Sequence, residues 1–475
     1  MKNRVYEAMS RFFDSVWYPV VYATICVVSG VNGKAVYVPM ACLLATLIIL
    51  SCFFAKNKRS FIAPVLMSFY CIGVDNPDGF NVSYAQLLGY YDLNGFIQVI
   101  IIGVIAASAL FIRLIRMGAF RRENQGKGPF LWGILLMGAA LLLNGIGSAD
   151  WKPVNLIYGF AFSGVLVFFY FLFRGCLTGE EDFAYICRIT VIMSCIAFAQ
   201  LVIVSIQRWQ AGTFFGYAGG VLTNYPDRGI ASLGWGIATS VGGILVLGVP
   251  AAMYLATRNR RGWFWCLAAL ALILLSLIPR SRSSMVAAGV LFILGLAIGC
   301  FYGENKKQLR SIAAILGGAA LIAGTWIIIS AKLSFSDLVS YIRLDKILED
   351  DRWDFWALAW EDLKSAPVVG VGFEKGAIFG EYRLNNVFSN MYHGIIPQFY
   401  GAMGILGICA FAKHLFDFGK TVLRRFSAAK LLLAAVPGMI LMMSLVDNFF
   451  FYANYQFVYC LFLALLEKSE KGLQQ

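Results

Sequence analysis

The stretch 279-PRSRSSMVAAGVLFILGLAIGCFYGENKKQLR-310 places a largely apolar run, residues 283–302, between two groups of basic side chains. A helix of about 20 such residues crosses the hydrocarbon layer of a bilayer. In lipid, a helix satisfies its backbone polar groups within one segment, whereas an irregular chain does not. The stretch therefore predicts a transmembrane helix whose two ends lie in charged turns.

The composition of the whole chain extends this interpretation. Of its 475 residues, 60% are hydrophobic and only 14% are charged, and the mean hydropathy is +0.73. A soluble domain of this size could not cover its surface with so few charges, so we expect a polytopic membrane protein. The 39 Lys and Arg exceed the 26 Asp and Glu. In a membrane protein this excess gathers on cytoplasmic loops, and it does not indicate nucleic-acid binding.

Apolar runs that are long enough, or nearly long enough, to cross a bilayer recur along the chain. They lie near 17–31, 35–54, 61–74, 96–113, 130–146, 156–173, 189–206, 230–256, 263–278, 283–302, 311–330, 395–416, 431–446 and 450–466. The sequence therefore predicts an all-α, polytopic membrane bundle of about 12–14 transmembrane helices, with residues 1–475 forming one domain. No internal repeat or soluble domain is evident in the sequence.

The basic residues of the connections alternate along the chain and so predict its topology. Connections rich in Lys and Arg hold Lys2/Arg4/Arg11, Lys56/Lys58/Arg59, Arg113/Arg116/Arg121/Arg122/Lys127, Arg258/Arg260/Arg261, Lys306/Lys307/Arg310 and Lys420/Arg424/Arg425/Lys430. The connections between them hold few or none, as in 75-DNPDGFNVSYAQLLGYYDLNG-95. Because cytoplasmic loops carry the cations, we expect both termini in the cytoplasm. The connections 207–229 and 331–394 and the turn 279–284 are then extracytoplasmic.

The external connection 331–394 is too long and too aromatic for a passive tether. Within it, 348-LEDDRWDFWALAWEDLKSAP-367 is typical of a helix, because acidic residues crowd its first turn and Pro367 ends it. Its apolar side chains recur at helical spacing as Trp353, Trp356, Trp360 and Leu363. Such a tryptophan stripe lies either at the lipid–water interface or against neighbouring helices. Both alternatives hold Arg352 at the height of the lipid headgroups.

Five arginines lie on the side of the membrane where cations are disfavoured. They are Arg280 and Arg282 in a short turn, Arg208 and Arg228 in the connection 207–229, and Arg352 in the long connection. Guanidinium groups grip phosphate oxygens in a bidentate manner and do not lose their proton. The set is therefore a candidate site for a lipid-linked phosphate or pyrophosphate. The alternative for each arginine is a pair with a lipid headgroup or a loop carboxylate.

The chain holds only two histidines, and one of them stands where the long connection meets a predicted span, in 389-SNMYHGIIPQFYGAMGILG-407. Neutral imidazole is the commonest side-chain base near pH 7, so His393 is a candidate general base. The alternative is a histidine that hydrogen-bonds a backbone carbonyl at a helix start. His414, beside Lys413 at the cytoplasmic end of the same span, is expected to be an interfacial residue or one that complements the helix dipole. Eleven scattered cysteines show no metal-like spacing.

The segment 260–420 resembles the O-antigen ligase/polymerase superfamily of bacterial cell-surface polysaccharide assembly. Four features carry the resemblance. They are the Ser-Arg of 280-RSRSSMVAAG-289, the Arg-headed helix of 352-RWDFWALAWEDLKSAPVVGVGF-373, the Pro-x-x-Gly-x-Gly at Pro367, Gly370 and Gly372, and His393 standing eleven residues before the Gly-x-x-Gly at Gly404 and Gly407. Three positions, Ser283, Gly394 and Ala402, depart from the residues frequent in the family.

The resemblance implies a GT-C-like fold and an inverting, metal-independent glycosyltransferase without a cofactor, working on the outer face of the bacterial inner membrane. Its donor would be a glycan on undecaprenyl pyrophosphate, and its acceptor another glycan. His393 would take the proton of the acceptor hydroxyl, while Arg352 and Arg282 stabilise the departing pyrophosphate, helped by Arg228 and Arg280 with Arg208 nearby. The glycines would allow tight turns and close helix packing.

Two acceptors fit this resemblance. A polymerase joins a growing lipid-linked chain to another lipid-linked repeat unit, for O-antigen, capsule or exopolysaccharide, and commonly works with a chain-length regulator. A ligase passes the finished glycan to lipid A-core or another acceptor. The span count favours the polymerase. The alternative from another class, a lipid-linked oligosaccharide transporter, predicts paired halves, broken helices and charges near the midplane. The sequence places its charges at the ends of the apolar runs.

Overall fold

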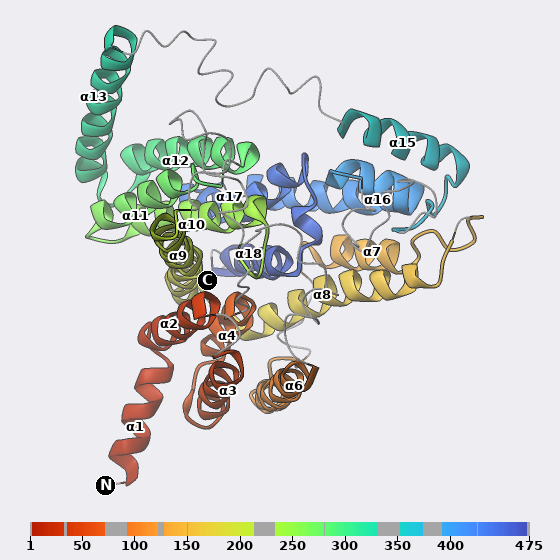
Figure 1. The fold of residues 1–475 in the computed structure, drawn as a ribbon, viewed down its shortest axis with the longest axis horizontal. Coiled ribbons are helices and arrows are strands. Elements are labelled where there is room, and N and C mark those ends of the chain that lie inside the picture. Colours follow the sequence, from red (N-terminus) through yellow and green to blue (C-terminus); the bar gives the residue numbers. More distant parts are fainter. Residues whose placement is uncertain are drawn as a thin grey trace.

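The structure is a computed structural model that describes residues 2–32, 36–71, 93–121, 128–149, 151–212, 233–279, 281–330, 352–373, 392–424 and 426–472. These residues form helices joined by turns, and an isolated bridge between Leu233 and Gly236 is the one extended pairing among them. The prediction of an all-α chain is therefore confirmed for the part that the structure describes (Figure 1).

The helices follow one another along the whole chain. They are α1 (Lys2–Phe13), α2 (Trp17–Asn32), α3 (Tyr37–Phe54), η2 (Lys58–Phe61), α4 (Ile62–Met67), η3 (Ser68–Cys71), α6 (Leu93–Arg116), α7 (Leu131–Leu142), α8 (Val154–Cys176), α9 (Glu181–Gln210), α10 (Ala238–Arg258), α11 (Gly262–Leu275), α12 (Arg282–Tyr302), α13 (Lys306–Ser330), α15 (Arg352–Ser365), α16 (Ile395–Leu423), α17 (Ala428–Ser444), η8 (Phe449–Phe451) and α18 (Ala453–Gly472).

In the described part of the chain, seven helices are long and apolar enough to cross a membrane, and the pair α1–α2, bent by 66°, would make an eighth span. The helices α7, α11 and α17 are apolar but shorter. The predicted run 61–74 is divided into η2, α4 and η3 instead of forming one helix of spanning length. A multi-pass membrane bundle is thus confirmed, and a count of 12–14 spans stays a prediction.

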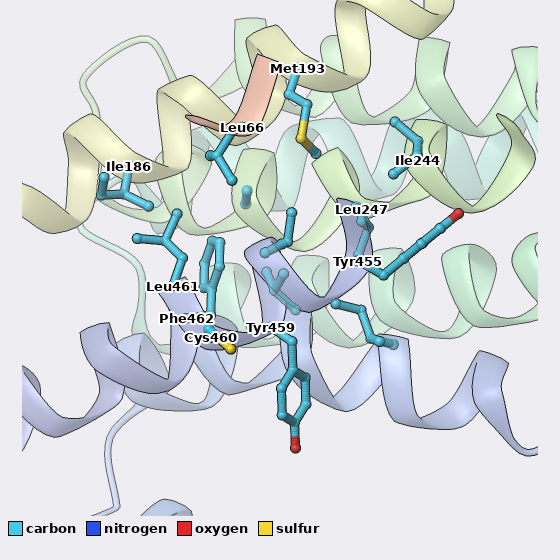
Figure 2. Close-up of a cluster of buried hydrophobic side chains, with 14 of the residues drawn as sticks. Leu66, Ile186, Met193, Ile244, Leu247, Tyr455, Tyr459, Cys460, Leu461 and Phe462 are labelled. Atoms are coloured by element: carbon cyan, nitrogen blue, oxygen red, sulfur yellow. The ribbon is translucent and has the colours of Figure 1, made fainter. Parts of the chain in front are cut away.

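The core of the bundle forms around α10, which is buried over nearly its whole length between α9, α11, α12 and α17. Figure 2 shows α18 entering this core, where Tyr455 lies beside Leu247 and the ring of Tyr459 points away from it. The small residue Gly243 allows the close approach, because a Cβ there would lie 2.1 Å from the Tyr455 hydroxyl oxygen. That hydroxyl donates a 2.6 Å hydrogen bond to the carbonyl oxygen of Ser240. Gly243 thus allows this contact between α10 and α18.

One end of the bundle gathers several of the connections that are rich in Lys and Arg. The Arg59 guanidinium lies 3.0 Å from the Asp182 carboxylate at the start of α9, and Arg113 donates to the carbonyl oxygen of Ala55. Eight residues before Asp182, the buried Arg174 at the end of α8 forms an ion pair of 2.6 Å with the buried Glu467 of α18. The connection that carries Arg59 therefore contacts Arg113 and Asp182. All three were predicted, from the alternation of charge, to lie on the cytoplasmic side.

Candidate functional site

His393 lies directly before α16, where the structure turns sharply into the helix. Gly394 supplies that turn with a φ of 146°, and a Cβ at this position would lie 2.9 Å from the carbonyl oxygen of Leu445. On the other side of His393, the backbone amide of Tyr392 donates 2.9 Å to the Gln398 side chain. The backbone on both sides of His393 is therefore fixed. The imidazole itself is 39% exposed and can be reached from outside the bundle.

The helix α15 packs along the first turns of α16, as Figure 1 shows. The Phe355 ring lies with its centroid 5.3 Å from that of the His393 imidazole, one helical turn after Arg352 begins α15. Further along, the hydroxyl of Tyr400 donates 2.8 Å to the carbonyl oxygen of Trp356. The predicted helix is confirmed as Arg352–Ser365, and its first turn lies over His393.

The tryptophan stripe of α15 divides between the two environments considered above. Trp353 and Trp360 remain about half exposed, at 52% and 53%, whereas Trp356 and Leu363 are partly buried against the neighbouring helix. The buried Asp362 accepts a hydrogen bond from the hydroxyl of Tyr392, the residue before His393. Burial and the Asp362 carboxylate raise the pKa of Tyr392 well above its usual value, so the phenol remains a donor at neutral pH.

The Pro-x-x-Gly-x-Gly turn closes a break in α16. Gly404 has φ 62° and ψ −152°, which interrupts the helix and leaves backbone groups without their usual partners. The turn supplies them: Val371 and Gly372 donate to the carbonyl oxygens of Gly401 and Ala402, both at 3.0 Å. In return, the amide of Ile405 donates 2.8 Å to the carbonyl oxygen of Pro367. The motif glycines therefore hold the loop after α15 against a broken membrane helix.

The turn between α7 and α8 forms hydrogen bonds to residues 369–373, the same loop after α15. The amide of Gly145 donates 2.8 Å to the carbonyl oxygen of Val369, and the amide of Phe373 donates 3.2 Å to the Asn144 side chain. The Asn144 amide group also donates to the carbonyl oxygen of Asn155. The segment that follows α15 is thus attached to α7, α8 and α16 together.

Asp447, in the turn after α17, faces the histidine. Its Oδ1 lies 4.0 Å from Nδ1 of His393, and its side chain is only 13% exposed. The same oxygen accepts a 2.7 Å hydrogen bond from the amide of Asn448, whose side chain accepts from the amide of Gly394. Asp447 is not part of any motif considered above. Its signal is a lone carboxylate in a short connection between the predicted runs 431–446 and 450–466.

The first turn of α12 packs against the end of α17, which leads to Asp447. The Ser284 hydroxyl lies 3.7 Å from the sulfur of Met443, which precedes Asp447 by four residues. Arg282 is the first residue of α12, and Arg352 is the first residue of α15. The two helices that begin with the predicted arginines therefore start in the neighbourhood of His393: the first turn of α12 contacts Met443 of α17, and the first turn of α15 contacts His393 through Phe355. The side chains of both arginines lie outside the described residues.

The remaining predicted arginines are not joined to this cluster by the described contacts. Arg228 and Arg280 lie outside the described residues. Arg208 is half-buried in the last turn of α9, a helix that packs mainly on α2 and α10. Two turns earlier in α9, Gln200 accepts a 2.7 Å hydrogen bond from the Trp235 indole. That contact secures the end of the connection that carries Arg228.

The prediction that His414 is an interfacial residue, or one that complements the dipole at the helix end, is wrong, because α16 continues to Leu423. This side chain is fully buried between α7, α16 and α18, and its Nε2 is 2.5 Å from the hydroxyl oxygen of Tyr459. The cause is Gly133, whose missing side chain lets α7 approach so closely that a Cβ would lie 3.0 Å from the Cα of His414. His414 thus packs in the bundle, while the charge of neighbouring Lys413 is paired with Asp417.

No family model matches this chain, and no characterised protein matches it closely enough to indicate common ancestry. The resemblance of the segment 260–420 to the O-antigen ligase/polymerase superfamily therefore depends on its motif residues and on where those residues lie.

Proposed function

We propose that this membrane protein is an inverting, metal-independent polysaccharide polymerase that uses undecaprenyl-pyrophosphate-linked repeat units on the outer face of the bacterial inner membrane. One observation carries the proposal above the others. A half-exposed imidazole, His393, faces the carboxylate of Asp447, and the helices headed by Arg282 and Arg352 converge on the same region.

The imidazole and the carboxylate suit the proton transfer of such a reaction. The acceptor hydroxyl attacks the anomeric carbon from the face opposite to the pyrophosphate, and His393 takes its proton as the new C–O bond forms. The charge that appears on the imidazole is stabilised by Asp447 at 4.0 Å. The carboxylate lies on the Nδ1 side of the ring, which leaves Nε2 for the acceptor hydroxyl.

The two helix starts suit the leaving group. As the old anomeric C–O bond breaks, its electron pair and negative charge pass to the undecaprenyl pyrophosphate. Arginine binds phosphate oxygens in a bidentate manner, and Arg282 and Arg352 each stand at the first position of a helix. The free amide groups and the positive dipole end of a helix favour an anion at this place. Fixed donors of this kind stabilise charge that develops in the transition state.

The transporter alternative gains one feature from the structure, since α16 is broken at Gly404. Broken helices in transporters expose backbone groups that coordinate ions or substrate. Here the turn 367–372 occupies the backbone groups on both sides of the break with hydrogen bonds of 2.8–3.1 Å. The break therefore serves to attach the loop after α15, which favours an enzyme over a transporter.

A gene deletion complemented with plasmid-borne variants tests the proposal. The deletion strain should show lone repeat units on the normal acceptor in a gel of surface glycans, and the wild-type chain should restore the ladder. His393→Ala should fail to restore it, although immunoblots show the protein in the membrane at the wild-type level. Long chains retained on the carrier lipid would instead identify a ligase. A full ladder from His393→Ala would overturn the glycosyltransferase and leave the transporter.

A further inference from the structure

At the end of the bundle remote from His393, the turn between α10 and α11 forms a shallow depression. It has a volume of about 570 Å³ and is lined by Asn259, Arg260, Arg261, Trp263, Phe264 and Trp265. We refer to it as the Arg–Trp depression. Its volume lies within the range of about 300–1,000 Å³ that small-molecule sites occupy. The 21 residues of α12, about 30 Å of helix, separate this end from the candidate active site.

The turn that carries the Arg–Trp depression is fixed by the neighbouring connection between α12 and α13. The amide of Glu304 donates 3.0 Å to the carbonyl oxygen of Thr257, and the Asn305 side chain donates to the carbonyl oxygen of Asn259. The Glu304 carboxylate also pairs with Arg258 at 3.1 Å. The backbone of the depression is therefore held in place before any ligand arrives.

The charges of the turn are unequally compensated. Arg258 has its partner in Glu304, whereas Arg260 and Arg261 are exposed and form no ion pair with a described residue. Two adjacent guanidinium groups without a carboxylate partner attract an anion, and their planar donors match phosphate oxygens. The polar side of the depression is thus suited to a phosphate group.

The other side of the depression is apolar and continues along α11. Trp263 and Phe264 are 45% and 51% exposed, and the exposed Leu267 and Leu274 follow Phe264 along one face of the helix. Aromatic rings of this kind lie at the boundary between headgroups and acyl chains. A free phosphate ion would contact the arginines alone, whereas a phospholipid would also cover this exposed face.

We infer that the Arg–Trp depression binds an anionic phospholipid of the surrounding bilayer. Its phosphate contacts Arg260 and Arg261, and its acyl chains lie against Trp263, Phe264 and Leu267. The site is independent of the proposed glycosyltransferase activity, because it lies at the opposite end of the bundle and uses none of its residues.

Native mass spectrometry of the full chain in detergent tests this inference. Phosphatidylglycerol or phosphatidylcholine is added in equal amounts, and the lipid-bound fraction is measured. The double variant Arg260→Gln/Arg261→Gln should bind phosphatidylglycerol about thirtyfold more weakly than the wild-type chain, because it removes both cations that contact the phosphate of the bound lipid. The matched variant Lys420→Gln/Arg424→Gln removes two exposed charges from another basic connection and should retain the wild-type affinity.

Three outcomes would overturn the inference. The first is equal phosphatidylglycerol binding by the wild-type chain and the Arg260→Gln/Arg261→Gln variant, when both elute as single species in gel filtration. The second is equal binding of phosphatidylcholine and phosphatidylglycerol by the wild-type chain. The third is displacement of phosphatidylglycerol by millimolar inorganic phosphate, which would identify a free anion as the ligand. Loss of binding in Trp263→Ala alongside intact arginines would support the lipid.

Discussion

Nδ1 of His393 lies 4.0 Å from Oδ1 of Asp447, across the junction between the start of α16 and the end of α17. The two residues are held in this relation by their neighbours, because the Asn448 side chain accepts from the amide of Gly394 and the Asn448 amide donates to Asp447. A carboxylate at this distance stabilises a protonated imidazole, which is the state that a general base reaches after it takes a proton.

This relation predicts that His393 and Asp447 act as one unit in catalysis. His393→Ala should reduce the rate of polymerisation by about 10²–10⁴-fold, the usual contribution of a general base. Asp447→Asn should reduce kcat roughly tenfold with little change in KM, because the carboxylate acts mainly when the imidazole is charged. The measurement is polymerisation of purified lipid-linked repeat units by the reconstituted protein. The double variant should be no slower than His393→Ala alone, whereas multiplied losses would show that the two residues act separately.

Replacing a motif arginine by lysine separates the geometry of the guanidinium from its charge. Arg352→Lys and Arg282→Lys keep the positive charge but lose the planar pair of donors that fits phosphate oxygens. Each should therefore reduce kcat about tenfold to a hundredfold. Arg4→Lys, on the exposed part of α1, makes the same chemical change away from the site and should leave the rate unchanged. Wild-type kcat in both motif variants would mean that these arginines do not contact the leaving group.

Gly404 is the glycine of α16 whose backbone conformation is predicted to exclude other residues. Its φ of 62° and ψ of −152° belong to a region that is essentially restricted to glycine, and a Cβ there would lie 2.6 Å from the carbonyl oxygen of Pro367. Gly404→Ala should lower the free energy of unfolding by about 1–3 kcal/mol from backbone strain alone. Thermal unfolding in detergent measures the change. Gly419→Ala, in the same helix with open space around the new methyl group, should be neutral or slightly stabilising. Equal effects at both positions would contradict the role assigned to the break.

The sequence predicted the parts of this architecture that depend on local pattern. Apolar length predicts membrane helices such as α10 and α12, and the acidic first turn with Pro367 predicts α15, because these signals lie within each segment. The break at Gly404 escapes such reasoning, since the apolar run continues across it and only the turn 367–372 stabilises the broken backbone. Asp447 and the burial of His414 were missed for the same reason. Both depend on residues distant in sequence, Gly394 and Gly133.

The hydrogen bond between Tyr392 and Asp362 predicts a pH-dependent contribution to stability. Tyr392→Phe leaves the buried Asp362 carboxylate without this donor and should lower the free energy of unfolding by about 1.5–3 kcal/mol at pH 8. Because burial and Asp362 raise the pKa of Tyr392 in the folded chain, its contribution is fully present below the unfolded tyrosine pKa of about 10 and is lost as the pH rises above it. The difference in stability between the wild-type chain and Tyr392→Phe should therefore shrink between pH 8 and pH 11. Tyr302→Phe, which removes an exposed hydroxyl from the end of α12, should give no difference at either pH. A Tyr392→Phe difference that stays constant over this range would contradict the assignment of the phenol as the donor to Asp362.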